Sequence, residues 1–236
     1  VRQCMRGVDA VIHAATLHKP HVATHTRQQF VDVNLTGTLN LLEEASDAAV
    51  SAFVFTSTTS VFGDALVPPP GAPAAWMTED VATVAKNIYG VTKLGAEGLC
   101  RLFHRNQGMP CIVLRTSRFF VELDDSPAYR ERFEDAPFRP DEVAELRTDL
   151  PVVLERHVPS YVAEYARRGW RMFPSISRVY DNTRAREALA WCPQWSFEHA
   201  VARLAANAEP RSDLARVVGS KGYHDMTFED GPYPVE

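Results

Sequence analysis

The stretch Ser51-Ala-Phe-Val-Phe-Thr-Ser57 is a short apolar run that continues directly into more hydroxyl side chains, up to Ser60. Two further apolar runs of similar length are Gly7-Val-Asp-Ala-Val-Ile-His-Ala-Ala15 and Cys111-Ile-Val-Leu-Arg115. Short runs of this kind are typical of strands that are buried on both faces of a parallel sheet. The sequence therefore predicts three buried strands.

Segments with helical periodicity separate these three runs. One covers residues 28–49 and the other covers residues 89–106. The alternation predicts an α/β fold, in which a Rossmann-like parallel sheet carries helices on both faces and the crossovers are right-handed. The positions expected to face the core are Phe30, Val33, Asn34, Gly37, Leu41, Leu42 and Ala45 in the first helix and Leu94, Leu99, Leu102 and Phe103 in the second.

The composition of the chain changes after Phe120, where charged residues and prolines become frequent. Before that point, residues 64–86 are rich in proline, alanine and glycine, which predicts a long irregular loop. We expect two domains: residues 1–120 contain the sheet, and residues 121–236 form a small, mainly helical lobe.

Helix signals also occur within the lobe. Residues 150–168 have a helical pattern that Pro159 interrupts, because proline cannot continue a helix from the preceding residue. Ser196 is placed to cap a further helix over residues 197–207.

The overall composition excludes several classes of protein. The chain has 236 residues, a formal charge of −5 and 45% hydrophobic residues, as in an ordinary globular protein, and this charge is unsuited to nucleic-acid binding. No apolar run approaches the roughly 20 residues that span a bilayer. The four cysteines are far apart and form no CxxC pair, so we expect a reducing compartment, the cytoplasm. We expect no metal site, because His18, His21 and His25 have no further ligand at zinc spacing upstream.

The segment Tyr89-Gly-Val-Thr-Lys93 is the strongest candidate for chemistry. Side chains four residues apart lie on the same face of a helix. A phenol has a pKa of about 10, and a nearby ammonium lowers it, so that the tyrosine can accept and donate a proton near neutral pH. A hydroxyl such as that of Thr58 could hydrogen-bond the oxygen that reacts.

A set of motifs follows one another in a fixed order along the chain. Together they resemble the extended short-chain dehydrogenase/reductase family, in its NAD-dependent epimerase/dehydratase branch, with UDP-glucose 4-epimerase-like character. The segments that carry the resemblance are Asp9-Ala-Val-Ile-His-Ala-Ala15, Asn34-Leu-Thr-Gly-Thr38, Phe55-Thr-Ser-Thr-Thr-Ser-Val-Phe-Gly63, Tyr89-Gly-Val-Thr-Lys93, Leu114-Arg115 and Tyr180-Asp-Asn-Thr-Arg-Ala-Arg-Glu-Ala-Leu-Ala-Trp-Cys-Pro193.

The resemblance implies a partial NAD(P)-binding domain over residues 1–120 and a substrate-binding lobe over residues 121–236. The catalytic residues would be Tyr89 as general acid/base, Lys93 as the residue that binds the nicotinamide ribose and lowers the tyrosine pKa, and Thr58 as the hydroxyl that contacts the substrate. The cofactor-binding residues would be Ala14, Ala15, Ser57, Tyr89 and Lys93. The substrate-binding residues would be Thr58, Thr59 and Arg118.

The activity that the resemblance implies is epimerisation of a nucleotide sugar with NAD as cofactor, with NADP as the alternative. A dehydratase usually has an acidic residue after the catalytic hydroxyl, and here that position is Thr59. Two other hypotheses stay open: an NADP-dependent carbonyl reductase of the same fold, and a truncated homologue that does not catalyse. The resemblance also implies a homodimer through the helices at 28–49 and 89–106.

The chain departs from the family pattern in two places. The family's glycine-rich turn, G-x-x-G-x-x-G after a first strand, does not occur, so we expect the N-terminal strands of the nucleotide-binding fold to be missing. An asparagine often follows the Leu-Arg pair, but here Arg118 and Phe119 occur in that region. We also expect that an internal stretch near residues 132–140 is missing.

Overall fold

The computed structural model describes residues 1–117 and 137–218, which divide into two compact units. The first unit contains residues 1–64 and 82–117, and the second contains residues 65–81 and 137–218. The predicted domain boundary at residue 120 lies outside the described residues and stays a prediction.

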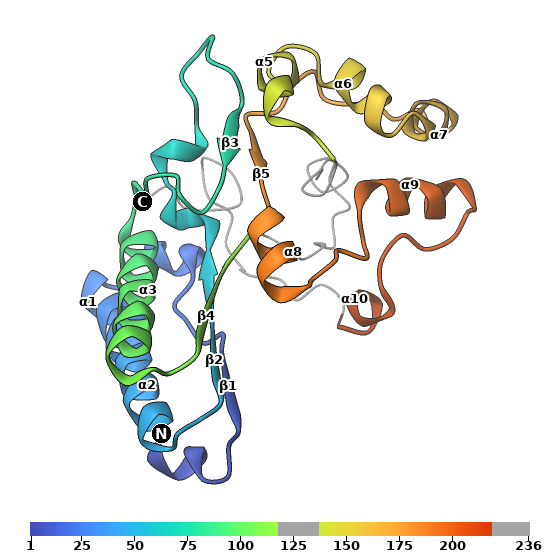
Figure 1. Ribbon diagram of the computed structural model, residues 1–236. Helices are drawn as coiled ribbons and strands as arrows, with labels where there is room; N and C mark the ends of the chain where they lie inside the picture. The colour runs from blue at the N-terminus through green and yellow to red at the C-terminus, as the bar shows by residue number, and fades with distance from the viewer. Residues whose placement is uncertain (118–136, 219–236) are drawn as a thin grey trace. The chain divides into compact units, whose positions relative to one another are not determined.

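The first unit is a parallel α/β structure (Figure 1). Its sheet has the order β1-β2-β4, and all of its pairs are parallel. Its strands are β1 (Ala10–His13), β2 (Ala52–Thr58) and β4 (Cys111–Thr116). Its helices are η1 (Arg2–Met5), η2 (Lys19–Ala23), α1 (Arg27–Phe30), the π-helical stretch η3 (Val31–Thr36), α2 (Gly37–Asp47), η4 (Thr59–Val61) and α3 (Ile88–Gln107), while η5 (Asp64–Leu66) begins at the end of this unit. The predicted α/β class and its strand–helix alternation are confirmed.

Helices α2 and α3 pack on the face of the sheet that carries Phe53 and Phe55 (Figure 1). The buried apolar residues of this core are Met5, Leu42, Ala45, Val50, Phe53, Phe55, Ala96, Cys100, Phe103 and Met109. On β1, Ala10 and Ile12 are exposed, Ile12 by 77%, and every residue of β4 is only partly buried, so the expectation that the strands are buried on both faces is wrong for β1 and β4.

Two of the positions expected in the helix cores are exposed, namely Val33 and Leu102. Val33 lies in the π-helical stretch, whose wider turn advances each residue by a smaller angle than an α-helix does. Side chains in this stretch therefore point in other directions than the α-helical spacing predicts. Along α3, the most buried face carries Lys93 and Glu97, and Leu102 lies off that face. A hydrophobic pattern cannot locate a buried face that carries charged residues.

The second unit combines helices with a small parallel sheet of β3 (Ala75–Met77) and β5 (Arg178–Tyr180). Strand β3 lies within residues 64–86, which were expected to form an irregular loop; its partner is about 100 residues away, and local sequence carries no sign of that pairing. The helices are η6 (Pro140–Glu142), α5 (Val143–Leu146), α6 (Leu150–His157), α7 (Ser160–Arg168), α8 (Thr183–Leu189), α9 (Phe197–Ala205) and α10 (Asp213–Val218).

Both helix predictions in the lobe are confirmed. Helices α6 and α7 are separate on either side of Pro159, and the Ser196 hydroxyl accepts a hydrogen bond of 3.1 Å from the backbone N–H of His199. The core between these helices contains Leu150, Val153, Leu154, Tyr161, Tyr165, Phe197 and Val201. In the parts of the chain that the structure describes, no helix is both long and apolar enough to cross a bilayer.

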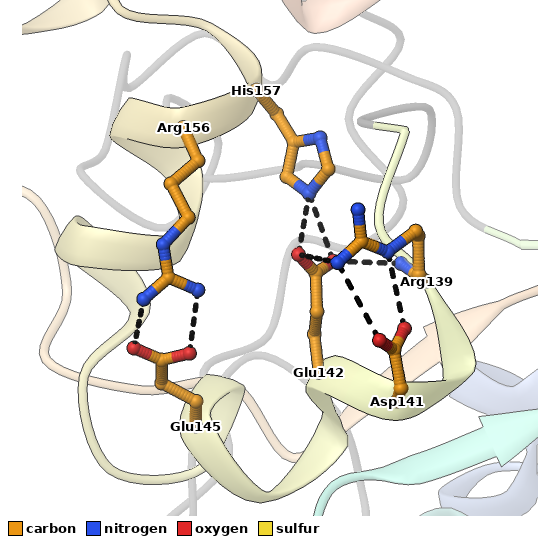
Figure 2. A network of polar contacts seen from close by, with 6 residues as sticks. All are labelled: Arg139, Asp141, Glu142, Glu145, Arg156 and His157. Carbon is orange, nitrogen blue, oxygen red and sulfur yellow. Dashed lines mark hydrogen bonds and ion pairs between the residues drawn. The ribbon is translucent and has the colours of Figure 1, made fainter.

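Two carboxylates join α5 and its preceding turn to α6 (Figure 2). The buried carboxylate of Glu142 lies 2.8 and 2.9 Å from Nε2 of His157 and accepts a 2.8 Å hydrogen bond from the backbone N–H of Arg139. The more exposed Glu145 forms two hydrogen bonds with the guanidinium of Arg156. The two acidic residues are three positions apart and differ in their partners and in their burial, since the side chain of Glu142 is 4% exposed and that of Glu145 is 37% exposed.

This difference in burial predicts unequal contributions to stability. We expect Glu142→Ala to lower the free energy of unfolding by about 3 kcal/mol, because it removes a buried acceptor from His157 and from a backbone N–H. Glu145→Ala should change it little, since exposed ion pairs contribute little. Urea unfolding followed by circular dichroism measures both values, and equal losses in the two variants would contradict the prediction.

Candidate active site

The start of α3 carries Tyr89 and is held against the end of β2. The side chain of Asn87 caps the helix by accepting a 3.1 Å hydrogen bond from the backbone N–H of Gly90. A Cβ atom on Gly90 would lie 2.9 Å from the backbone oxygen of Ser60. The absence of a side chain at Gly90 therefore lets the first turn of α3 approach the hydroxyl-rich turn that follows β2.

Lys93 lies one helical turn after Tyr89, and its side chain is buried. Its ammonium donates a 2.5 Å hydrogen bond to the backbone oxygen of Thr56 and lies 4.1 Å from the ring centroid of Phe55. Burial lowers the pKa of Lys93 to about 8, while the charge of Glu97 acts in the opposite direction. The predicted pair of Tyr89 and Lys93 thus shares the buried face of one helix.

Glu97 continues the same helical face, four residues after Lys93, and is almost completely buried. Its carboxylate accepts hydrogen bonds from the Ser57 hydroxyl at 2.6 Å and from Arg115 Nε and Nη2 at 3.1 and 2.8 Å. The sequence interpretation missed Glu97. The available signal was its spacing, since residues 89, 93 and 97 follow one another at intervals of four.

The hydroxyl-bearing residues at the end of β2 have different partners. Thr58 Oγ1 accepts a 3.1 Å hydrogen bond from the backbone N–H of Ser60, and the Thr58 hydroxyl proton lies outside that bond. Ser57, expected to contact the cofactor, donates its hydroxyl proton to Glu97. Thr59 is half-buried and begins η4.

The turn after β1 contains Ala14 and Ala15, which are exposed. Because β1 and β2 are parallel and His13 pairs with Phe55, this turn and residues 56–58 lie at the same edge of the sheet. Carboxyl ends of parallel strands are where ligands bind in open α/β sheets. The structure therefore places the Ala14–Ala15 turn and the end of β2 at neighbouring positions.

The side chain of Asn34 holds this turn in place. Its Oδ1 accepts hydrogen bonds from the backbone N–H of Leu17 at 2.7 Å and from the Thr16 hydroxyl at 3.0 Å. Its Nδ2 lies 3.0 Å from the backbone oxygen of Leu17 and 3.1 Å from Thr92 Oγ1. Thr92 precedes Lys93, so a single amide connects the β1 turn to the helix that carries the candidate catalytic pair.

The histidines near this edge form no metal site in the described part of the chain, where no three potential ligands come together. The ring of His18 lies 5.3 Å from that of Tyr89, and His21 Nδ1 accepts a hydrogen bond from the backbone N–H of His18, the residue that caps η2. Burial lowers the pKa of His13 to about 4, and the charge of Lys93 acts in the same direction. Arg118, expected to bind substrate, lies outside the described residues.

Comparisons with known proteins point to one family. The model of the NAD dependent epimerase/dehydratase family matches residues 1–134. A UDP-glucose 4-epimerase of Oryza sativa is 35% identical over 120 residues, which cover 51% of this chain and 27% of that relative. A UDP-glucose 4-epimerase of Erwinia amylovora is 32% identical over 121 residues, which cover 48% of this chain and 34% of that relative. The chain thus spans about a third of the length of the curated relatives it matches.

The fold also matches a solved structure. UDP-glucuronic acid 4-epimerase from Bacillus cereus, in complex with UDP-glucuronic acid and NAD, aligns with a TM-score of 0.54 at 20% identity. The alignment covers 92% of this chain and 78% of that one. At this identity the likeness concerns the fold.

The close approach at Gly90 predicts an asymmetry between two glycines. Gly90→Ala should lower the free energy of unfolding by roughly 1–3 kcal/mol, because its Cβ would clash with the backbone oxygen of Ser60. Gly37→Ala is the control: its Cβ would meet only Asp32 O at an ordinary 3.7 Å, and the better helix propensity should raise stability by up to about 1 kcal/mol. Denaturant unfolding of both variants tests this, and a stabilised Gly90→Ala would refute it.

Proposed function

Because this chain belongs to the NAD-dependent epimerase/dehydratase family, we propose that it takes part in the epimerisation of a nucleotide sugar, with NAD as the cofactor. The observation that carries the proposal is the buried Lys93, which bonds to Thr56 O, two residues before Thr58, and lies one turn after Tyr89. The names of the similar relatives, which are UDP-glucose 4-epimerases, support a UDP-hexose as the substrate class.

In this proposal Tyr89 moves the proton. Its phenolate accepts the proton of a sugar hydroxyl as the carbon beside it is oxidised, and the phenol returns the proton when the ketone is reduced. The ammonium of Lys93 favours the phenolate form, as an opposite charge does. The Thr58 hydroxyl accepts from Ser60 N–H and can therefore donate its own proton to the sugar oxygen, which orients it for the transfer.

The residues at the sheet edge fit the nicotinamide end of NAD. Ala14 and Ala15 present small, exposed side chains at the end of β1, and Lys93 provides an ammonium for ribose hydroxyls. Ser57 is less suited to contact the cofactor, because its hydroxyl proton is donated to Glu97. When bound, NAD would accept a hydride from the sugar carbon and return it to the opposite face. Within the described residues, no glycine-rich turn follows a strand to hold the pyrophosphate.

The alternatives predict different results. An NADP-dependent carbonyl reductase would oxidise added NADPH with a ketone and show no epimerase activity. In its simplest form, a truncated homologue that only folds or associates with partners would bind no cofactor. A dehydratase is disfavoured because Thr59, the residue after Thr58, carries no carboxyl group. We also propose a cytoplasmic location, since all four cysteines are free thiols, as is typical of a reducing compartment.

The Tyr89 hydroxyl is the most direct point at which to test this function. With UDP-glucose and NAD, we expect Tyr89→Phe to lower the rate of UDP-galactose formation by about 10²–10⁴-fold, because the proton acceptor is lost. Tyr161→Phe is the matched control: its hydroxyl donates to Pro151 O inside the second unit, and the rate should stay near that of the wild type. Chromatography of the sugar nucleotides measures the rates. A wild-type chain that neither shifts its melting temperature with NAD nor converts UDP-glucose would refute the proposal.

We further propose that the chain forms a homodimer through the outer surface of the helices at 28–49 and 89–106. On α3, Val91 and Leu102 are 52% and 37% exposed, and their spacing of 11 residues places them on one face. Gly98 lies between them at helical spacing, is exposed and has open space where a Cβ would lie, which allows a second helix to approach closely. Val33 of the neighbouring helical segment is exposed as well.

Replacement of an apolar residue on this surface should dissociate the dimer. We expect Val91→Asp to shift the chain from dimer to monomer in analytical ultracentrifugation, because it buries a charge in the interface. Val162→Asp on α7, where the valine is 40% exposed, is the control and should leave the mass unchanged. A wild-type chain that sediments as a monomer at micromolar concentration would contradict this proposal.

A further inference from the structure

We propose that Glu97 is a positioning residue of the candidate active site: its buried carboxylate holds the end of β2 against α3 and thereby sets the place and the charge of Lys93. The role in catalysis rests on the function proposed above. The effect on Lys93 is a property of the chain itself and can be measured in the absence of substrate.

The geometry joins three elements at one carboxylate. Glu97 on α3 accepts hydrogen bonds from Ser57 of β2 at 2.6 Å and from Arg115 of β4 at 2.8 and 3.1 Å. Ser57 lies between Thr56, whose backbone oxygen accepts the Lys93 ammonium, and Thr58. Displacement of the Glu97 carboxylate would therefore move both neighbours of Ser57 relative to α3.

Arg115 extends this arrangement beyond Thr58. Its guanidinium lies 4.9 Å from the ring centroid of Phe62, directly after η4. On the N-terminal side of Thr58, the hydrogen bond between Ser57 and Glu97 fixes the strand. On its C-terminal side, Phe62 packs on Arg115, which Glu97 also binds. Both supports depend on the same carboxylate.

Glu97 also supplies negative charge near Lys93. Burial lowers the pKa of Lys93, and Glu97 raises it. The other titratable groups near the ammonium include Tyr89 on α3, His13 on β1 and Cys100 on α3. His13 has a pKa lowered to about 4 and Cys100 one raised to about 12, so both are neutral near pH 7. A Tyr89 phenolate would act on Lys93 in the same direction as Glu97, and the guanidinium of Arg115 on β4 binds the Glu97 carboxylate directly. Glu97 is therefore the carboxylate of this set that raises the pKa of Lys93.

The test compares the pKa of Lys93 in three proteins without cofactor or substrate, by NMR titration of ¹³C-labelled lysine side chains. The wild type should titrate near 8. In Glu97→Gln we expect a value lower by about one pH unit, because the opposing charge is lost while the size of the side chain is kept. Glu142→Gln, which changes a buried carboxylate of the second unit, should lower stability without moving the Lys93 titration.

The outcomes separate a positioning role from a purely structural one. If Glu97→Gln lowers stability but Lys93 titrates as in the wild type, the proposal is wrong. If Glu97→Gln does not fold, Glu97→Asp is the second variant, because it keeps the charge on a shorter side chain. A Lys93 pKa in Glu97→Asp that lies between the wild-type value and the value expected for Glu97→Gln supports the proposal. A Lys93 pKa in Glu97→Asp that equals the wild-type value refutes it. If the wild-type chain is active, we expect kcat to fall at least tenfold in Glu97→Gln, while KM stays within threefold of the wild-type value. If the wild-type chain is inactive, the proposed function is refuted, and the titration of Lys93 still tests the role of Glu97.

Discussion

A buried ammonium group constrains the whole first unit. Lys93 lies in a low-polarity environment, where an unpaired charge is costly. The structure compensates with the backbone oxygen of Thr56, the ring of Phe55 and the nearby charge of Glu97. Each of these partners has to be at the end of β2 or on the same face of α3. The need to satisfy one charge therefore determines how closely helix and strand pack.

Other residues make that close packing possible. Gly90 allows the helix start to approach the turn that follows β2, and Asn34 ties the β1 turn to Thr92 beside the lysine. These residues have no chemical role in the proposed reaction. They bring the ends of two parallel strands and the first turn of α3 to one edge of the sheet, where an open α/β sheet binds its ligands.

Much of the first unit could be predicted from local patterns. The three apolar runs became β1, β2 and β4, and the helical segments between them are present, because strand and helix periodicities are local properties. The spacing of four residues between Tyr89 and Lys93 identifies the candidate pair. The predictions that failed concern which side chains face the core. Val33 is exposed because it lies in a π-helical stretch, which changes the angle between successive side chains, and Leu102 lies off the buried face of α3, which carries Lys93 and Glu97.

The sequence by itself determined the α/β class, the positions of β1, β2 and β4 and of the helical segments between them, and the candidate pair on α3, since all of these follow from the order and spacing of residues. Only the tertiary structure decided which polar groups are buried and with which partners. Ser57, Glu97 and Arg115 are up to 58 residues apart and meet through strand pairing and helix packing. β3 and β5 likewise pair across about 100 residues. Such contacts arise from the folding of distant segments onto each other, and no local pattern records them.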